Sequence, residues 1–246
     1  MKVLLSWSSG KDSAWALHVL RQEGRHVAGL LTTMNEEADR VAMHGVRRSI
    51  AQAQANAAGL PLILVPLPNP CSNEIYESRM TAAVRAAVAD AYTHVAFGDL
   101  FLEDIRKYRE DRLAGTGLNP LFPLWNRPTD VLAVEMIDAG VDARLTCVDQ
   151  RVLPKQLAGR HFDRELLATL PPGTDPCGER GEFHTCVLSG PMFTRRIEAD
   201  PGEIVERGDF VFADLVLRTL GPESTHGPSD LRTLGPTQTP HSPGAE

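Results

Sequence analysis

Short apolar segments alternate with amphipathic ones over the first hundred residues, and this alternation restricts the possible folds more than any other feature of the chain. Apolar runs of strand length lie at 2–7, 26–33, 62–65 and 93–97. Between them, apolar residues recur every three or four positions, a helical period, at 12–23, 46–58 and 80–91. Strands that alternate with helices predict an α/β fold, with a parallel sheet covered by helices on both faces. Ligands bind such sheets beyond the carboxyl ends of the strands, so the polar strand ends at 8–13 and 98–99 are expected to face one crevice.

The pattern changes between about residues 100 and 130. Helices are predicted at 103–113 and 130–139, and strands at 144–148 and 210–217, among more frequent Pro and Gly residues. We therefore expect an α/β domain over 1–125 and a smaller α+β domain over 126–218. The remaining segment, 219–246, has no apolar periodicity and many Gly, Pro, Ser and Thr residues, which predicts a disordered tail.

Composition narrows the class of protein. The 246 residues are 42% hydrophobic and 23% charged, as in ordinary soluble proteins. No run of about 18 apolar residues occurs, so no membrane partner is expected. The N-terminus lacks the long apolar region of a signal peptide, so we expect a cytoplasmic protein. A net charge of −7 argues against an extended nucleic-acid surface, which needs clustered cations.

Four cysteines stand at 71, 147, 177 and 186, and no pair has the C-x-x-C spacing of zinc or redox sites. Cys177, His184 and Cys186 lie close in sequence, but their spacing does not match that of a metal site. Free thiols are therefore expected, with no metal bound by this group.

The segment SSGKDS, residues 8–13, carries the strongest functional signal. It follows a predicted strand and opens a predicted helix, whose N-terminus presents unpaired N–H groups and a partial positive charge. Small residues let a phosphate approach this backbone closely. The segment is not a Walker A loop, because Leu5 and Asp12 stand where that motif needs Gly and Ser or Thr. An ordinary capped helix is the alternative, but the strand before and the helix after favour a phosphate site.

A second cluster, CGERGEFHT, occupies residues 177–185 and places Glu179 and Glu182 around a glycine. Two carboxylates at this spacing can bind Mg²⁺, bind ammonium or act as a general base. The residues alone slightly favour a polar turn with solvated acids, which is a common arrangement.

Together the two segments resemble a known family. Residues 8–13 are similar to the SGGKDS loop of the PP-loop ATP pyrophosphatases, with Ser9 in place of a glycine. Residues 179–185 resemble the E-G-G-E-[FY]-x-[ST] signature of the diphthine–ammonia ligase (diphthamide synthase) family, with Arg180 in place of a small or amide residue. The resemblance covers about residues 1–218, and the segments 43–45, 98–99, 106–109, 123–125 and 190–193 fit it as well.

The resemblance implies an adenine nucleotide alpha-hydrolase-like, Rossmann-like fold and an ATP-dependent amide ligase. Such an enzyme uses ATP and Mg²⁺, adenylates a carboxylate with release of pyrophosphate, and then transfers ammonia to it. The family's named acceptor is a modified histidine on a translation elongation factor. The arginine and alanine bias of this chain suggests a bacterial source, where that acceptor is not expected. The acceptor is therefore an unidentified carboxylate, small or protein-borne.

Carried onto this sequence, the motifs assign three sets of residues. The catalytic set is Lys11, Asp12, Glu179 and Glu182. The ATP-binding set is Ser8, Ser9, Gly10, Lys11, Asp12, Ser13, Gly98 and Asp99. The substrate set is His44, Arg106, Arg109 and His184. A structural hydrogen bond is an equal role for each histidine, and a solvated helix face is an equal role for the two arginines.

Two other functions stay open at this stage. A PP-loop tRNA-modifying enzyme would share the ATP loop, but thiolation employs paired cysteines and RNA binding favours a basic surface. A nucleotide-binding sensor would bind ATP without turning it over.

Overall fold

The computed structural model describes residues 1–218, and the predicted tail at 219–246 lies outside the described residues. The first ten elements follow in order: β1 (Lys2–Ser6), α1 (Lys11–Gln22), β2 (His26–Asn35), β3 (Arg40–Val41), α2 (Arg48–Ala58), β4 (Leu62–Leu67), α3 (Asn73–Ala89), β5 (His94–Ala96), α4 (Glu103–Leu113) and β6 (Asn119–Leu121). The rest are α5 (Thr129–Asp138), β7 (Asp142–Asp149), the 3-10 helix η1 (Lys155–Leu157), α6 (Arg164–Thr169), β8 (Phe183–Ser189), β9 (Ala199–Arg207) and β10 (Phe210–Leu217).

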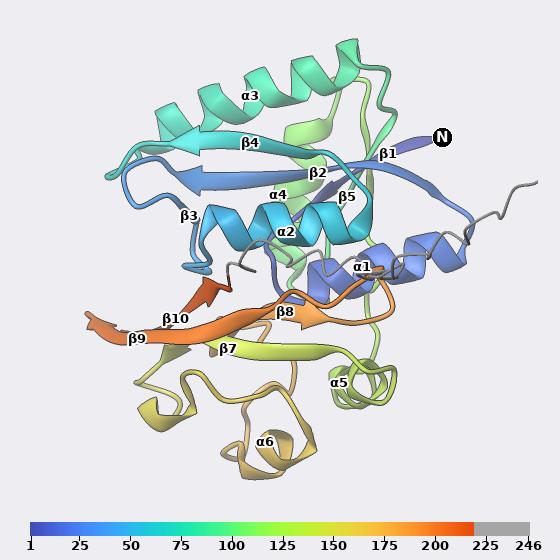
Figure 1. Cartoon of the computed structure of the whole chain (residues 1–246). Coiled ribbons are helices and arrows are strands. Elements are labelled where there is room, and N and C mark those ends of the chain that lie inside the picture. Colours follow the sequence, from blue (N-terminus) through green and yellow to red (C-terminus); the bar gives the residue numbers. More distant parts are fainter. Residues whose placement is uncertain (219–246) are drawn as a thin grey trace, which may run out of the picture.

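Five strands form a parallel sheet in the order β4-β2-β1-β5-β6, and β3 pairs antiparallel with the end of β2. Helices cover both faces: α1 and α2 lie on one, α3 and α4 on the other (Figure 1). The predicted α/β fold is thus confirmed. Helices connect the strands because two adjacent parallel strands need a crossover segment that returns the chain to the edge where the first strand began.

A second sheet has the antiparallel order β8-β7-β10-β9. It faces the parallel sheet across α1 and α2, because α1 contacts β8 and α2 contacts β10 (Figure 1). This sheet and its helices form the smaller α+β part that the sequence predicts. The two helices α1 and α2 therefore lie between two sheets, which fits the alanines along α2.

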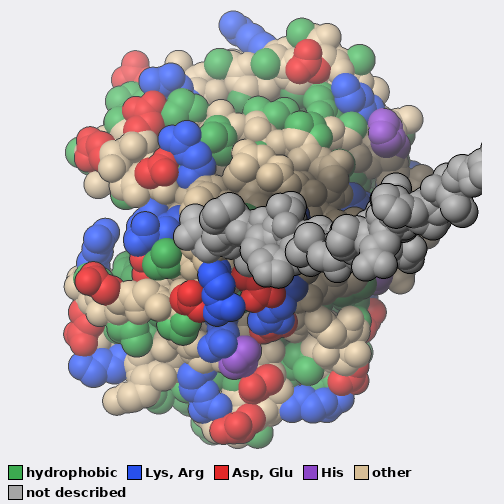
Figure 2. Space-filling view, viewed as in Figure 1, with side chains coloured by type: hydrophobic (Ala, Val, Ile, Leu, Met, Phe, Trp, Pro, Cys, Tyr) green, Lys and Arg blue, Asp and Glu red, His purple; other side chains and the backbone are tan. Residues whose placement is uncertain are grey.

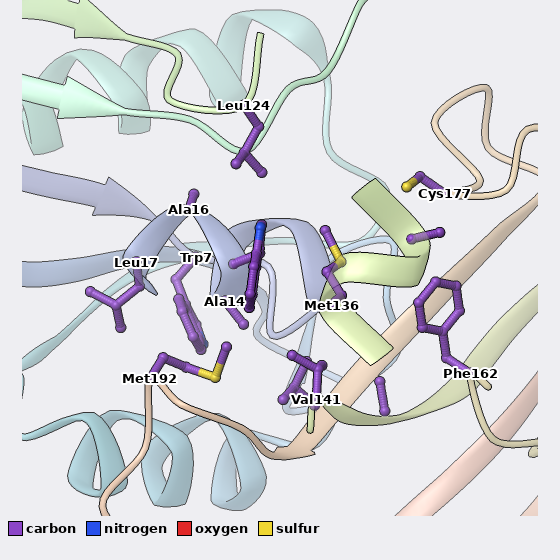
Figure 3. Packing of buried hydrophobic residues seen from close by; sticks show 14 of the residues in the cluster. Trp7, Ala14, Ala16, Leu17, Leu124, Met136, Val141, Phe162, Cys177 and Met192 are labelled. Carbon is purple, nitrogen blue, oxygen red and sulfur yellow. The ribbon is translucent and has the colours of Figure 1, made fainter. Parts of the chain in front are cut away.

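One apolar cluster crosses from the first sheet to the second. Trp7 at the end of β1 and Trp15 of α1 are each 2% exposed, and the same cluster contains Met136 of α5 and Phe162 (Figure 3). Burial of this surface against water stabilises the contact between the two halves. Consequently the β1–α1 connection is held from both sides.

The sequence prediction gives no range for four strands and one helix: β3, β6, β8, β9 and α6. The strand β3 has two residues, β6 contains Pro120 at the sheet edge, and β9 is largely exposed, so none shows an apolar pattern. The helix predicted at 80–91 instead begins at Asn73, where the hydroxyl of Ser72 caps it by accepting the N–H of Ile75.

Both charge signs are interspersed on the face seen in Figure 2. Within residues 1–218, no helix has the length and apolar character needed to cross a membrane.

Candidate ATP-binding site

The loop between β1 and α1 is tightly fixed. Ser9 is fully buried with a positive φ of 69°, a conformation that glycine adopts readily and other residues rarely. Its carbonyl oxygen accepts the N–H of Val187 at 3.0 Å and the side-chain amide of Gln54 at 3.1 Å. Its hydroxyl has no hydrogen-bond partner among the described residues. The strained geometry accounts for the glycine of the PP-loop pattern at this position.

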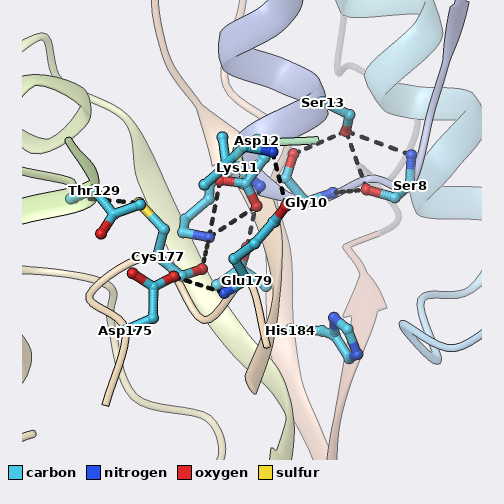
Figure 4. Close-up of polar contacts among 12 residues, drawn as sticks. Ser8, Gly10, Lys11, Asp12, Ser13, Thr129, Asp175, Cys177, Glu179 and His184 are labelled. Atoms are coloured by element: carbon cyan, nitrogen blue, oxygen red, sulfur yellow. Dashed lines mark hydrogen bonds and ion pairs between the residues drawn. The ribbon is translucent and has the colours of Figure 1, made fainter. Parts of the chain in front are cut away.

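Helix α1 begins at the cavity without a side-chain cap from its own N-cap residue. Gly10 is the N-cap and supplies no side-chain cap, while Thr185 Oγ1 from β8 accepts the N–H of Lys11 at 3.0 Å. The hydroxyls of Ser8 and Ser13 lie 3.2 Å apart (Figure 4). Such a terminus attracts anions, because its N–H groups and dipole present positive charge.

The ammonium of Lys11 is turned into the protein. Its side chain is 2% exposed, and Nζ lies 2.9 Å from Asp12 Oδ2 and donates to the carbonyl of Cys177 (Figure 4). Burial, the largest single influence, lowers the pKa of Lys11, but Asp12 and the other acidic groups nearby together outweigh it, so the pKa lies above its ordinary value. Lys11 is therefore a buried cation that ties α1 to the loop before β8.

The end of β5 approaches α1 closely at Gly98. A Cβ atom there would lie 2.9 Å from both the carbonyl carbon of Asp12 and the nitrogen of Ser13. Only glycine allows this contact, since the neighbours are backbone atoms. The next residue, Asp99, has Oδ2 at 3.4 Å from Arg109 Nε.

The two acids of the 177–185 segment face different ways. Glu179 Oε1 accepts the N–H of Leu100 at 2.7 Å, and burial followed by the charges of nearby acids raises the pKa of Glu179 to about 7. Glu182 is 5% exposed and accepts the N–H groups of Asp175 at 3.1 Å and Arg180 at 3.0 Å. Glu182 thus holds the turn together, while the Glu179 carboxyl lies at the end of β5.

His44 and His184 form a close pair, with ring centroids 4.4 Å apart and ring planes tilted by 42°. Burial and the neighbouring ring lower the pKa of His44 well below its ordinary range. Burial, with the Lys11 cation nearby, lowers the pKa of His184 to about 4. Both rings are consequently neutral near pH 7, and the Nδ1 atom of His44 has no partner among the described residues.

These groups surround a cavity of about 220 Å³ at the carboxyl ends of β1 and β5. Of the residues expected at the site, those that line it are Ser8, Lys11, Asp12, Ser13, His44, Gly98, Asp99, Arg109, Glu179 and His184. Those that do not are Ser9, Gly10, Arg106 and Glu182. The expectation that 8–13 and 98–99 face one crevice is met.

Two family models match the chain. The diphthamide synthase N-terminal domain matches residues 1–118, and the diphthamide synthase C-terminal domain matches residues 128–215. The chain belongs to the diphthamide synthase family. As a member of it, the chain is an ATP-dependent ligase that forms a carbon–nitrogen bond.

Curated relatives carry the name diphthine–ammonia ligase. The one from Danio rerio is 27% identical over 95% of this chain and all of its own length, and the one from Bos taurus is 24% identical over 87% and 88%. A longer relative from Schizosaccharomyces pombe is 27% identical, but the match covers only 37% of its length. Among solved structures, a predicted subunit of a tRNA methyltransferase from Methanocaldococcus jannaschii has a TM-score of 0.44 and 16% identity, over 78% of this chain and 98% of that one.

In this member of the diphthamide synthase family, the two arginines of α4 have different surroundings. Arg109 lines the cavity and stacks its guanidinium 4.8 Å from the Phe97 ring centroid. Arg106 lies between Phe122 and Trp125, at 4.8 and 4.7 Å, on a separate part of the surface. Arg106 and Arg109 lie one helical turn apart, but only Arg109 reaches the cavity.

Several cavity residues were missed by sequence reasoning. Phe97 and Phe183 line the cavity from the ends of β5 and β8, and Thr185 caps α1. Thr185 was available as a signal, since it closes the family's E-x-x-E-[FY]-x-[ST] pattern. Phe183 fills the [FY] position of the same pattern, whereas Phe97 looks like an ordinary core residue in the sequence.

An ion-pair cluster holds the His44 segment against the second sheet. Asp214 of β10 accepts from Arg40 Nη1 at 2.6 Å and from Arg47 Nη2 at 2.6 Å. Arg40 Nη1 also donates to the carbonyl of Gly45 at 2.7 Å. Burial opposes ionisation, but these two arginines hold the pKa of Asp214 down to about 2. The cluster fixes the loop that carries His44 from both ends.

Proposed function

We propose that this ligase adenylates a carboxylate with ATP, releases pyrophosphate and transfers ammonia to the activated carbonyl. The observation that carries the proposal is the 220 Å³ cavity, which combines the first turn of α1 with the carboxyl of Glu179. The helix N-terminus would bind phosphate, and the carboxyl would bind or deprotonate ammonium. One cavity would therefore hold the groups needed for adenylation and for ammonia transfer. The 1–125 domain supplies the former and the 126–218 domain the latter.

The phosphates of ATP would lie against α1, where Ser8 and Ser13 add hydroxyl donors. The helix N-terminus stabilises the negative charge that develops on pyrophosphate as it leaves. Asp12 and Asp99 both line the cavity, and carboxylate oxygens together with phosphates are the ligands that Mg²⁺ prefers. These two residues would hold Mg²⁺, which neutralises phosphate charge when bound.

Glu179 is the proposed base for ammonium. A carboxyl with a pKa of about 7 is ionised in about half of the molecules at neutral pH and accepts a proton more readily than an ordinary carboxylate. It would take a proton from ammonium and leave ammonia free to attack the acyl-adenylate. Glu182 is proposed as a positioning residue, because its carboxylate fixes the turn that presents Glu179.

Lys11 and the histidine pair would act on charge in different ways. Lys11 supplies positive potential from its buried place beside Asp12, where its ammonium is already engaged. His44 and His184 are neutral and would donate hydrogen bonds to phosphate or adenylate oxygens.

The three buried thiols, Cys147, Cys177 and Cys186, favour the ligase over a thiolation mechanism. Burial raises the pKa of Cys147 and of Cys186 to about 12, and it also raises the pKa of Cys177. The thiolate is the nucleophile in sulfur transfer, and these groups stay protonated.

The test is ammonium-dependent consumption of ATP with a carboxylate acceptor, offered as a diphthine-bearing elongation factor or as a mixture of small acids. We expect Glu179→Gln to remove most of the dependence on ammonium, whereas Glu165→Gln, an exposed change on α6, has no effect. ATP consumption that is equal with and without ammonium for every acceptor would contradict the proposal.

A further inference from the structure

A second, larger cavity lies beside the first. It occupies about 460 Å³ between α3 and α4, within the range of about 300–1,000 Å³ that is usual for small-molecule sites. Its walls are mainly apolar or aromatic, from Tyr76, Met80, Val84, Val88 and Tyr108. No assigned step of the ligase reaction uses this space.

Cationic groups rim the cavity. Arg85, Arg109 and Arg112 line it, against a single acid, Glu77, which pairs with Arg112. Arg85 forms no ion pair within residues 1–218. An apolar chamber with surplus guanidinium groups suits an anion that has an apolar body, because guanidinium pairs well with carboxylate.

Two residues belong to both cavities. Phe97 and Arg109 line the space between α3 and α4 as well as the candidate ATP site. The contact from Arg109 Nε to Asp99 is 3.4 Å, longer than the 2.7–2.9 Å of a strong charge-assisted hydrogen bond. A carboxylate from a bound molecule can therefore replace Asp99 on Arg109 and lie at the edge of the ATP site.

We propose that the cavity between α3 and α4 binds the acceptor, and that the acceptor is a small carboxylic acid with an aromatic or branched apolar body. This inference rests on the proposed function and names its substrate class. The body lies among the side chains of α3 and α4, and the carboxylate is directed by Arg109 toward ATP. Arg85 adds long-range attraction for the anion.

The test uses 8-anilinonaphthalene-1-sulfonate as a fluorescent probe of the full chain, displaced by 3-phenylpropionate or by its neutral amide. Val84→Trp fills the cavity, and Ala82→Trp on the exposed side of the same helix is its control. Arg85→Gln removes the unpaired cation, and Arg79→Gln on the same helix is its control. Circular dichroism and ATP binding are measured for each variant.

We expect 3-phenylpropionate to displace the probe and the amide to do so at least threefold more weakly. Val84→Trp should abolish probe binding and keep ATP binding, while Arg85→Gln should weaken the carboxylate up to about fivefold, as for an exposed ion pair. Equal displacement by acid and amide, or unchanged binding in both Val84→Trp and Arg85→Gln, would overturn the acceptor site. Because binding is read without turnover, failure of the ligase proposal would appear separately, as ATP that is never cleaved.

Discussion

Replacing Ser9 tests whether the phosphate loop stores backbone strain. Ser9 has a φ of 69° and a fully buried hydroxyl without a partner among the described residues. A non-glycine residue in this conformation destabilises the fold by about 1–2 kcal/mol. Glycine removes this strain but itself costs about 0.5–1 kcal/mol, because its unfolded chain has more conformational freedom. An unpaired buried hydroxyl costs about 1–3 kcal/mol. The two contributions are separable, because Ser9→Ala removes the hydroxyl alone and Ser9→Gly removes both.

We expect Ser9→Ala to raise the free energy of unfolding by about 1 kcal/mol and Ser9→Gly to add about 0.5–1 kcal/mol more, measured by denaturant unfolding without ATP. The total corresponds to a rise in Tm of about 4 °C or more for a chain of this size. Ser49→Gly, in the exposed part of α2, is the matched control and should lose about 0.5 kcal/mol. If Ser9→Gly is no more stable than Ser9→Ala, the strain argument is wrong. A loss of stability in Ser9→Ala would mean that the hydroxyl has a partner.

Three further predictions address the site. Gly98→Ala forces β5 away from α1 and should cost about 1–3 kcal/mol of stability and at least tenfold in ATP affinity, measured by calorimetry; unchanged affinity would refute the close approach. Because Glu179 has a raised pKa, the wild-type rate with ammonium should rise with pH through about 7, and Glu179→Gln should lack this rise. Asp214 has a depressed pKa of about 2 in the folded protein. Its contribution to the free energy of unfolding is therefore fully present above its unfolded pKa of about 4 and is lost as pH falls through about 2. Asp214→Asn should therefore lose about 1–2 kcal/mol at pH 7 after allowance for solvent screening, and the difference from wild type should vanish near pH 2.

The parallel sheet was predictable because its strands are buried on both faces and are therefore continuously apolar. Strands without that constraint escaped prediction. The edge strand β9 is largely exposed, and β3 has only two residues, held by pairing with β2. Periodicity reports burial, so a strand that is formed by pairing and not by burial leaves little trace in the sequence.

The position of the site was predictable, but the direction of its side chains was not. The 8–13 motif identifies the loop because strand, small residues and helix are local. The partner of the Lys11 ammonium, the carbonyl of Cys177, lies 166 residues away. Likewise, spacing cannot tell which of Glu179 and Glu182 faces the cavity. The backbone of the turn decides which carboxylate accepts the N–H groups of the turn and which one faces the cavity.

The central claim is cleavage of ATP between its α- and β-phosphates, and ATP labelled at the α-phosphate tests it most directly. The protein is incubated with this ATP, Mg²⁺, ammonium and a small-molecule extract, and the labelled products are separated. The account predicts labelled AMP together with pyrophosphate, more with extract than without, and less in the Gly98→Ala variant at the same ATP concentration. Labelled ADP as the product would contradict it.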